Sequence, residues 1–416
     1  MERTYQEVVD TISNARRFGR QPGVEVTAHM LSVLAQRGMD GYRRIPFIHV
    51  AGTNGKGSVC AFLNSILTEA GLRVGVFTSP HLIAFEERIV ANGQRIAEAD
   101  VQRLGNLLLG MEFDLCPTMF DYCLVMALLY FAEQSCDVMI LETGLGGRLD
   151  STNAVGTPAV SVITKIGLDH MAVLGDSLTQ IAREKAGIIK EGTALVLETQ
   201  EENVLSVFLE EAKWHKLSHV HVVSREEIEK MRAAELPLQG TYQWENAAAA
   251  VAAAKIFCQQ QYGKALQEQV LSAGISKTVW PGRMEQLSTH PFLLVDGAHN
   301  GHGVHALYES LTNLYPGEKF HFVMAVMADK DYENMIGELL PLAMDFATYT
   351  PESERALQGR LLAECIRSRG VAVTEVESVR EIFARLKEGE KTICFGSLYF
   401  IGEVCAYHAA ESGMNR

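Results

Sequence analysis

Basic residues, paired cysteines and long apolar runs are all scarce in this chain of 416 residues. Lys and Arg total 37 against 51 Asp and Glu, so the formal net charge is −14. Binding to nucleic-acid backbones needs a basic surface, and we therefore expect no nucleic-acid partner. The eight cysteines include no C-x-x-C pair, which argues against a zinc or thioredoxin-type site. Buried thiols in a reducing cytosol are the simpler interpretation.

Signals for membrane insertion and export are lacking as well. The longest unbroken apolar runs fall well short of the about 18 residues that a membrane span needs. Residues 1–7 carry acidic side chains and none of the apolar character of a signal peptide. With only 11 prolines, a Pro-rich fibrous or disordered chain is excluded. We expect a cytoplasmic protein with no membrane partner, acting as a monomer.

Strand-like and helix-like segments alternate along most of the chain. Apolar runs indicate strands at residues 45–51, 73–78, 137–142 and 160–165. After the first run the spacing becomes helical, and Gly71 ends that helix. One face of this helix carries Val59, Phe62, Leu63, Ile66 and Leu67. Apolar strands alternating with helices predict an α/β fold with a mainly parallel sheet covered on both faces.

A second alternating set begins after the Pro-Gly punctuation at residues 280–283. Its strands are expected near residues 292–296, 320–325, 346–350, 372–376 and 392–395, and an Ala-rich helix at 247–257 precedes it. We therefore expect two domains, residues 1–282 and 283–416. The second has a normal size for a separate α/β domain of the Rossmann-like kind.

A glycine-rich loop joins the first expected strand to the first expected helix. It consists of Gly52, Thr53, Asn54, Gly55, Lys56, Gly57 and Ser58. Backbone N–H groups of such a loop, together with the helix N-terminus, attract phosphate, and a lysine there reaches the β and γ oxygens. The strict P-loop string is not met, because Val50 replaces its first glycine and Gly57 separates Lys56 from Ser58. A plain glycine-rich turn with a solvated lysine is the weaker alternative.

The whole series of motifs resembles the folylpolyglutamate synthase/dihydrofolate synthase family of Mur-ligase-like, ADP-forming amide ligases. The matching strings lie at residues 49–58, 78–82, 141–153, 167–170, 183–190, 280–283, 296–300, 328–331, 353–356 and 396–399. They follow the family's order and span nearly the whole chain. The resemblance implies an N-terminal P-loop ATPase domain of the Mur-ligase type and a smaller C-terminal ligase domain.

Metal-binding residues are implied by the same resemblance. Ser79, Glu142 and His170 match the family's Mg²⁺ ligands, and each follows a separate expected strand. The carboxyl ends of parallel strands face one crevice, and Mg²⁺ prefers oxygen ligands. Lys185 matches a lysine that is carbamylated by CO₂ in the related ligases. The resemblance implies that the carbamate of Lys185 would be a further Mg²⁺ ligand. The alternative interpretation is that Lys185 is an ordinary lysine on the solvated face of a helix.

The resemblance also assigns ATP and folate contacts. Asn246, Arg283, Asp296 and His299 match positions that contact ATP from the Ala-rich helix, the hinge and the second domain. Phe120, Asp121, Arg148 and Asp150 border the expected folate pocket, which the loop at residues 17–25 also resembles. Arg355 and Ser397 belong to the expected glutamate end, where the arginine fork suits a carboxylate. Asp121 and Leu124 depart from the family's Glu and Thr, which bears on dihydropteroate binding.

The expected reaction adds L-glutamate to the glutamyl carboxylate of tetrahydrofolate with ATP and Mg²⁺. The carboxylate becomes an acyl phosphate while ADP leaves, and the glutamate amine then displaces phosphate. Lys56 is expected to neutralise charge on the transferring phosphoryl group. His170 and a Lys185 carbamate are both candidates for the base. The resemblance is compatible with polyglutamate synthesis alone and with the additional synthesis of dihydrofolate from dihydropteroate.

Two alternatives compete with this reading. Another Mur-like ADP-forming ligase would act on a cell-wall nucleotide, but such ligases usually carry an additional N-terminal domain. Only about 50 residues precede the phosphate loop, fewer than a domain of that kind needs. A non-ligating P-loop nucleotide-binding protein would hydrolyse ATP slowly and independently of glutamate. It would leave His170 and Lys185 without a role.

Overall fold

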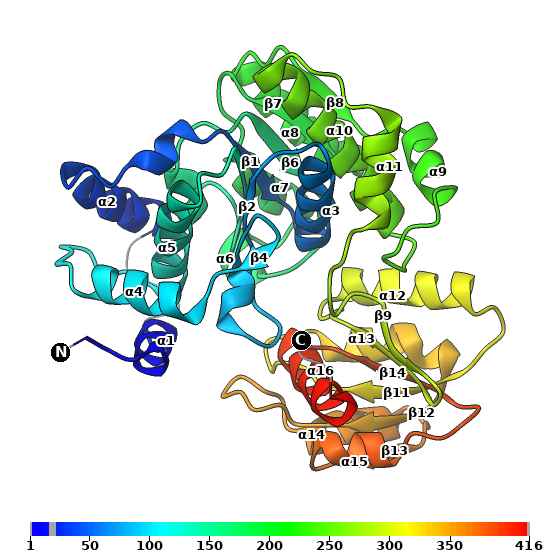
Figure 1. Cartoon of the computed structure of the whole chain (residues 1–416). Helices are drawn as coiled ribbons and strands as arrows, with labels where there is room; N and C mark the ends of the chain where they lie inside the picture. Colours follow the sequence, from blue (N-terminus) through cyan, green and yellow to red (C-terminus); the bar gives the residue numbers. More distant parts are fainter. Residues whose placement is uncertain (1, 16–21, 414–416) are drawn as a thin grey trace. The chain divides into compact units, whose positions relative to one another are not determined.

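The computed structural model describes residues 2–15 and 22–413, and contacts between Cα atoms divide the chain into two compact units. The first unit comprises Met1–Pro237 and Trp244–Thr278, and the second comprises Leu238–Gln243 and Val279–Arg416 (Figure 1). The short segment Leu238–Gln243 is not anticipated by the expected boundary at residue 282. Long-range hydrogen bonds connect this segment to the second unit, such as the 3.1 Å bond from Thr241 N to Ser310 Oγ.

The first unit is built on an eight-stranded sheet with the order β4-β3-β2-β5-β1-β6-β7-β8. Pairing is parallel from β2 to β8, and only the edge pairs β2–β3 and β3–β4 are antiparallel. The strands are β1 (Phe47–Ala51), β2 (Val74–Phe77), β3 (Ile89–Ala91), β4 (Gln94–Arg95), β5 (Val138–Glu142), β6 (Val160–Ile163), β7 (Ala194–Leu197) and β8 (Val220–Val222). A mainly parallel sheet is therefore confirmed.

Helices cover both faces of this sheet. They are α1 (Tyr5–Ser13), α2 (Gly23–Gln36), α3 (Lys56–Glu69), α4 (Glu98–Leu109), α5 (Met119–Glu133), α6 (Met171–Leu174), α7 (Leu178–Ala186), α8 (Glu202–Trp214), α9 (Arg225–Arg232), α10 (Gln243–Tyr262) and α11 (Glu268–Ser276). Short 3₁₀ helices lie at Gly41–Arg44, Phe85–Arg88 and Ser151–Ala154. Figure 1 shows α5 and α3 on opposite sides of the sheet.

Burial explains why the central strands are almost entirely apolar. Every residue of β1, β5, β6 and β7 is buried, as expected for a sheet packed on both faces. Phe47, Phe77 and Leu141 join one apolar cluster with α1, α2, α4 and α5. A second cluster unites Ile163 and Leu197 with α7 and α8. These two clusters fix the strand ends, where the candidate site residues lie.

The second unit repeats this construction on a smaller scale. Its six-stranded sheet has the order β13-β12-β11-β14-β10-β9, parallel except for the β9–β10 edge pair. The strands are β9 (Glu285–Thr289), β10 (Phe292–Asp296), β11 (Phe320–Met324), β12 (Ala343–Thr348), β13 (Val373–Glu375) and β14 (Lys391–Phe395). The helices are α12 (Gly301–Leu314), α13 (Tyr332–Leu339), α14 (Gly359–Ser368), α15 (Val379–Ala384) and α16 (Leu398–Ser412), with a 3₁₀ turn at Leu340–Leu342.

All nine strands expected from apolar runs are present, within a few residues of their expected ends. The structure adds β3, β4, β7, β8 and β9. Strands β4 and β8 carry exposed side chains and β9 is only half-buried, so their sequences lack the apolar runs that marked the central strands. Within residues 2–15 and 22–413, no helix is long and apolar enough to cross a bilayer.

Candidate active site

The phosphate loop lies where the sequence predicts it, between β1 and α3. Gly55 precedes the first residue of α3 with φ +89°, a left-handed conformation that favours glycine. The Lys56 ammonium donates to the carbonyl oxygens of Gly52 and Thr53, each at 3.3 Å. Ser58 is buried in the first turn of the helix. The loop thus presents a lysine and a helix N-terminus at one place, as a phosphate site requires.

Glu142 ends β5 directly beside this loop. Its Oε1 lies 3.9 Å from Lys56 Nζ, and its Oε2 accepts a 3.0 Å hydrogen bond from the backbone N–H of Ser79. The carboxylate is only 4% exposed. The next side chain, Thr143, is also buried, and its hydroxyl has no hydrogen-bond partner among the described residues. Glu142 therefore lies beside Lys56 and holds the backbone of Ser79, and Thr143 is its neighbour in the sequence.

Lys185 approaches the same loop from α7. Its side chain is 4% exposed, and Nζ donates a 2.7 Å hydrogen bond to the carbonyl oxygen of Gly52. Burial, and after it the charge of Lys56, lower the pKa of Lys185 to about 7, while Asp169 and Asp150 act in the opposite direction. The alternative interpretation, a lysine on a solvated helix face, is therefore wrong, because Lys185 is buried against the phosphate loop.

His170 follows β6 and immediately precedes α6. It is exposed and adopts a left-handed backbone conformation, with φ +51°. Its backbone N–H donates to Asp169 Oδ1 at 2.8 Å. No group of three His, Cys, Asp or Glu side chains in the described part of the chain is close enough to hold a metal ion. The metal role of His170 stays a prediction.

Asn246, in the first turn of α10, lies against the phosphate loop. A Cβ atom on Gly55 would overlap Asn246 Oδ1, so the loop glycine and this amide are in close contact. Asn246 is 3% exposed. Of the residues predicted to contact ATP, those of the loop and Asn246 are thus brought together within the first unit. Arg283, Asp296 and His299 belong to the second unit.

Asp121, predicted to border the folate pocket, is fully buried near the start of α5. Its Oδ1 accepts from the hydroxyls of Thr27 at 2.7 Å and Ser151 at 2.6 Å. Its Oδ2 accepts from the N–H and hydroxyl of Thr118, at 2.8 and 2.6 Å. Both oxygens are therefore used within the protein, and a ligand would have to displace one of these donors to contact Asp121 directly.

The other predicted folate-pocket residues surround the loop that follows β5. Phe120 packs against Gly144 of this loop and against Phe77. Asp150 is buried and accepts hydrogen bonds from the N–H groups of Leu145 and Thr152, at 2.8 and 3.0 Å. Arg148 is exposed and forms an ion pair with Glu184 of α7. Of the predicted loop at residues 17–25, residues 17–21 lie outside the described residues.

In the second unit, Asp296 and His299 lie at the carboxyl end of β10, and Arg283 precedes β9. Asp296 ends β10 and is 3% exposed; its oxygens accept from Met284 N, Ala298 N and the Tyr242 hydroxyl, at 2.8, 2.8 and 3.0 Å. The Arg283 guanidinium lies beside Gly297, and His299 Nδ1 is 2.8 Å from the Gly297 carbonyl oxygen. Arg283, Asp296 and His299 are therefore gathered around one turn.

Arg355 and Ser397 lie elsewhere along the same sheet edge. Arg355 is exposed, and its guanidinium donates to both carboxylate oxygens of Asp329, at 2.8 and 3.0 Å. Ser397 precedes α16 and is 2% exposed. Its hydroxyl has no hydrogen-bond partner among the described residues. A buried hydroxyl at a helix N-terminus is a natural partner for an anion.

Some residues beside the candidate site were not predicted. Lys165, Glu198 and Glu245 form a polar cluster behind the phosphate loop, and Asp329 holds Arg355. Glu198 could have been noticed, because it directly follows an apolar strand. Glu245 immediately precedes Asn246 at the start of a helix. Their mutual contacts, however, join segments between 33 and 80 residues apart, and no local pattern records them.

Comparisons with known proteins identify the family. The Mur ligase middle domain matches residues 50–254, and the Mur ligase glutamate ligase domain matches residues 282–398. The dihydrofolate synthase/folylpolyglutamate synthase of Bacillus subtilis (strain 168) is 35% identical, over 96% of this chain and 98% of the relative. The chain belongs to the dihydrofolate synthase/folylpolyglutamate synthase family. It is an ATP-dependent, ADP-forming ligase with the Mur-type architecture.

Solved structures of the family share the fold over nearly the full length. A Mycobacterium tuberculosis folylpolyglutamate synthase complexed with ADP has a TM-score of 0.86, 27% identity, and 97% and 98% coverage of the two chains. Escherichia coli FolC in complex with DHPP and ADP has a TM-score of 0.84 and 27% identity, with 99% of both chains covered. The fold and the ligase class expected from the sequence are thereby confirmed.

Proposed function

We propose that this chain adds L-glutamate to the glutamyl carboxylate of a reduced folate, and that it uses dihydropteroate as a second acceptor. The observation that carries the ligase chemistry is the arrangement around Lys56, and the second acceptor is supported by the name of the Bacillus subtilis relative. The Lys56 ammonium sits at the start of α3, 3.9 Å from the Glu142 carboxylate, and the buried Lys185 donates to the same loop. Cations at a glycine-rich helix N-terminus bind phosphate, and an adjacent carboxylate suits the accompanying metal.

Mg²⁺ fits the residues present. Glu142, Ser79 and the neighbouring Thr143 hydroxyl are hard oxygen donors, and the buried Thr143 hydroxyl lacks a partner among the described residues. Glu142 and Ser79 are the proposed ligands, with His170 as predicted from the family. Mg²⁺ holds few protein ligands and completes its shell with water and phosphate oxygens. When bound, it supplies positive charge to the phosphates.

The protein's own contribution to the reaction is positioning and charge. Lys56 holds the γ-phosphate of ATP in line with the folate carboxylate, which attacks phosphorus and forms an acyl phosphate as ADP leaves. The α-amino group of glutamate then attacks the acyl carbon, phosphate leaves, and the amine gives up one proton. His170 and a carbamylated Lys185 are the two candidates for accepting that proton.

Lys185 is proposed to carry a carbamate in the active enzyme. Only a neutral amine reacts with CO₂, and burial lowers the pKa of Lys185 to about 7, so the neutral amine is accessible near neutral pH. The test is Lys185→Ala, with acetate added as a substitute carboxylate. Rescue by acetate supports the carbamate, whereas wild-type activity without acetate contradicts it. Lys190→Ala is the matched control: Lys190 bonds the Asn153 carbonyl oxygen at 2.9 Å, and acetate should not rescue it.

The folate and glutamate contacts are proposed as follows. Phe120, Arg148 and Asp150 line the pteridine side, while Asp121 acts indirectly by holding Thr27 and Ser151. Arg355 and Ser397 receive the glutamate carboxylates. Binding at Arg355 requires its guanidinium to exchange Asp329 for the substrate carboxylate. We further propose a monomer that works in the reducing cytoplasm, consistent with eight free cysteines.

The deciding experiment measures ADP release with Mg²⁺-ATP and glutamate, once with tetrahydrofolate and once with dihydropteroate, and identifies products by mass. A gain of one glutamate on both acceptors is the expected result. Addition to tetrahydrofolate alone would limit the chain to polyglutamate synthesis and give the Asp121 and Leu124 departures a role. A gain of glutamate on neither acceptor would contradict the proposed substrates.

A further inference from the structure

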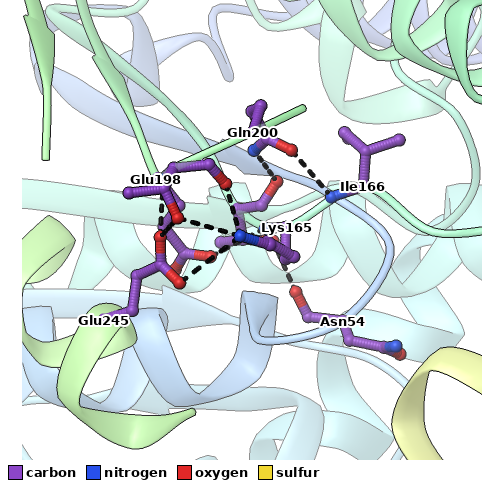
Figure 2. Close-up of polar contacts among 8 residues, drawn as sticks. Asn54, Lys165, Ile166, Glu198, Gln200 and Glu245 are labelled. Carbon is purple, nitrogen blue, oxygen red and sulfur yellow. Dashed lines mark hydrogen bonds and ion pairs between the residues drawn. The ribbon is translucent and has the colours of Figure 1, made fainter. Parts of the chain in front are cut away.

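A polar cluster lies directly behind the phosphate loop, formed by residues that the proposed chemistry does not use. Its members are Lys165, Glu198, Thr199, Gln200 and Glu245, and we refer to them as the rear cluster. Lys165 follows β6, residues 198–200 follow β7, and Glu245 lies in the first turn of α10. Figure 2 shows Glu198 and Glu245 on one side of Lys165 and Asn54 on the other. All of these residues belong to the first unit.

The segment that bears Lys165 is bonded to the phosphate loop. Thr53 N donates to the Lys165 carbonyl oxygen at 3.0 Å, and Thr164 Oγ1 donates to the Asn54 carbonyl oxygen at 2.6 Å. The Thr53 hydroxyl also donates to the Gly167 carbonyl oxygen at 3.0 Å and lies 3.1 Å from the Gly167 N–H. The loop's path at Thr53 and Asn54 is therefore set by residues 164–167.

Residues 198–200 hold this segment from the opposite side. The Lys165 backbone N–H donates to Glu198 Oε2 at 2.7 Å, and the Lys165 ammonium donates to the carbonyl oxygen and hydroxyl of Thr199, at 2.7 and 2.8 Å. Gln200 accepts from Ile166 N at 3.2 Å and donates to the Thr164 carbonyl oxygen at 3.1 Å. Five hydrogen bonds thus fix residues 164–166 to the end of β7.

Glu245 extends the cluster to α10. Its Oε1 accepts from Thr199 N at 2.5 Å and from the Thr199 hydroxyl, and its Oε2 lies 3.7 Å from Lys165 Nζ. The next residue, Asn246, contacts Gly55 of the phosphate loop. The contacts therefore form a closed ring. It runs from the loop through residues 164–167, then 198–200, then Glu245 and Asn246, and back to the loop.

We propose that Glu245 and Lys165, acting through Thr199, are positioning residues for nucleotide binding: their contacts fix Asn246 and the phosphate loop relative to one another. The inference rests on the proposed nucleotide site. Neither residue is assigned a contact with ATP. Loss of the Glu245 carboxylate releases the start of α10 from residue 199. Loss of the Lys165 ammonium removes two of the five bonds to the end of β7 and the ion pair with Glu245. Either change loosens the ring that holds Asn246 and the loop.

Burial makes these contacts consequential. Glu198 is 2% exposed, and the side chain of Glu245 is 18% exposed. Hydrogen bonds to charged groups in such surroundings are stronger than those at the surface, because less water competes for them. The Lys165 ammonium lies 3.7 Å from Glu245 Oε2, and its positive charge acts on Glu198 as well. Removing one side chain of the rear cluster should therefore also weaken the hydrogen bonds among the remaining ones.

The test measures binding of a fluorescent ADP analogue, together with kcat and the KM for ATP, in wild type, Glu245→Ala, Glu245→Gln and Lys165→Met. Glu245→Ala and Lys165→Met should each weaken analogue binding and raise the KM for ATP by about 10-fold, with kcat changed less than about 3-fold. Glu245→Gln keeps an acceptor for Thr199 and should restore most of the affinity. The losses in the Glu245→Ala, Lys165→Met double variant should be less than additive, because both changes act on the same ring.

Controls separate this inference from the proposed function. Weak binding by Lys56→Ala, compared with wild type, establishes the nucleotide site itself. Glu268→Ala breaks a surface pair with Lys255 of the same helix α10, at 3.2 Å, and should leave binding unchanged. If the Glu245→Ala variant proves unstable, Thr199→Val removes only the hydroxyl that joins Lys165 to Glu245 and should still weaken binding. Unchanged nucleotide affinity in Glu245→Ala and Thr199→Val, alongside an intact Lys56 effect, would overturn the inference. So would strictly additive losses in the double variant.

Discussion

The two units place charged side chains at the same end of similar parallel sheets, but they use the charges differently. In the first unit, Lys56 and Lys185 donate to backbone carbonyl oxygens of the phosphate loop, and Lys56 stays 3.9 Å from Glu142. In the second, Asp296 accepts three hydrogen bonds and Arg355 holds Asp329 at 2.8 Å. The first arrangement sets two lysines against one loop, whereas the second pairs its charged groups with partners of its own unit.

Removal of Lys56 is the most severe test of this contrast. Lys56→Ala should lower kcat by about 10³-fold or more, because a charge aimed at the transferring phosphate is lost. The fold should persist, since the Lys56 ammonium makes its 3.3 Å bonds only to carbonyl oxygens of its own loop. ADP release and far-UV circular dichroism measure the two effects. Lys255→Ala, on the surface of α10, is the matched control and should keep full activity. Activity near wild type in Lys56→Ala would remove the loop from the mechanism.

Removal of Asp296 should instead destabilise the second unit. Asp296→Ala leaves the N–H groups of Met284 and Ala298 and the Tyr242 hydroxyl without their acceptor, at a cost of about 2 to 4 kcal/mol in the free energy of unfolding. Denaturant unfolding measures the loss. Asp345→Ala, a half-buried position on β12, is a control expected to cost far less. An unfolding free energy equal to wild type, with weakened nucleotide binding, would contradict a stabilising role of Asp296 in the second unit.

Arg355 offers a smaller and more selective test. Its pair with Asp329 is exposed, so that pair contributes at most about 1 kcal/mol to stability. Arg355→Ala should therefore leave the unfolding midpoint nearly unchanged while raising the KM for glutamate about 10-fold. Asp329→Asn releases the guanidinium and should lower that KM or leave it unchanged. A rise in the KM for glutamate in Asp329→Asn would show that the pair itself forms the binding surface.

The smallest expected effect concerns pH and Glu198. Burial, and after it the neighbouring Glu245, raise the pKa of Glu198 well above its ordinary range, while Lys165 acts against them. The folded chain then retains a proton that the unfolded chain has released, so the free energy of unfolding falls as pH rises through the folded-state pKa. Glu198→Gln stays uncharged and should lose this decline. Unfolding midpoints of both proteins, measured from acidic to alkaline pH, should diverge with rising pH. Parallel curves would contradict the raised pKa.

The sequence predicted the parts of the fold that local patterns record. Central strands are buried at every position and almost entirely apolar, as in β5 up to Glu142, and the glycine-rich loop at Gly52–Ser58 marks the change from strand to helix. The family resemblance added the positions of Glu142 and Lys185, which composition alone would not distinguish from surface charges. Their convergence on one loop follows from parallel strands that end at the same edge of the sheet.

Most of what the sequence did not predict depends on contacts between distant segments. Strand β7 differs, because all of its residues are apolar and buried and its local pattern was missed. The buried Asp121 carboxylate accepts hydrogen bonds from hydroxyls 94 and 30 residues away, on Thr27 and Ser151. The pair of Lys165 and Glu245 spans 80 positions, and the half-buried or exposed strands β8 and β9 carry no apolar run. Apart from β7, each case is decided by tertiary packing, which overrides local propensity.

The path of the backbone between the units carries a practical consequence. The chain crosses from one unit to the other three times, after residues 237, 243 and 278, because Leu238–Gln243 belongs with the second unit. A gene fragment that starts at residue 279 would omit Tyr242, whose hydroxyl bonds Asp296, and Thr241, which bonds Ser310. The second unit is therefore not separable by a single cut. Swapping it between relatives as a module requires transplanting the short insert along with the C-terminal stretch.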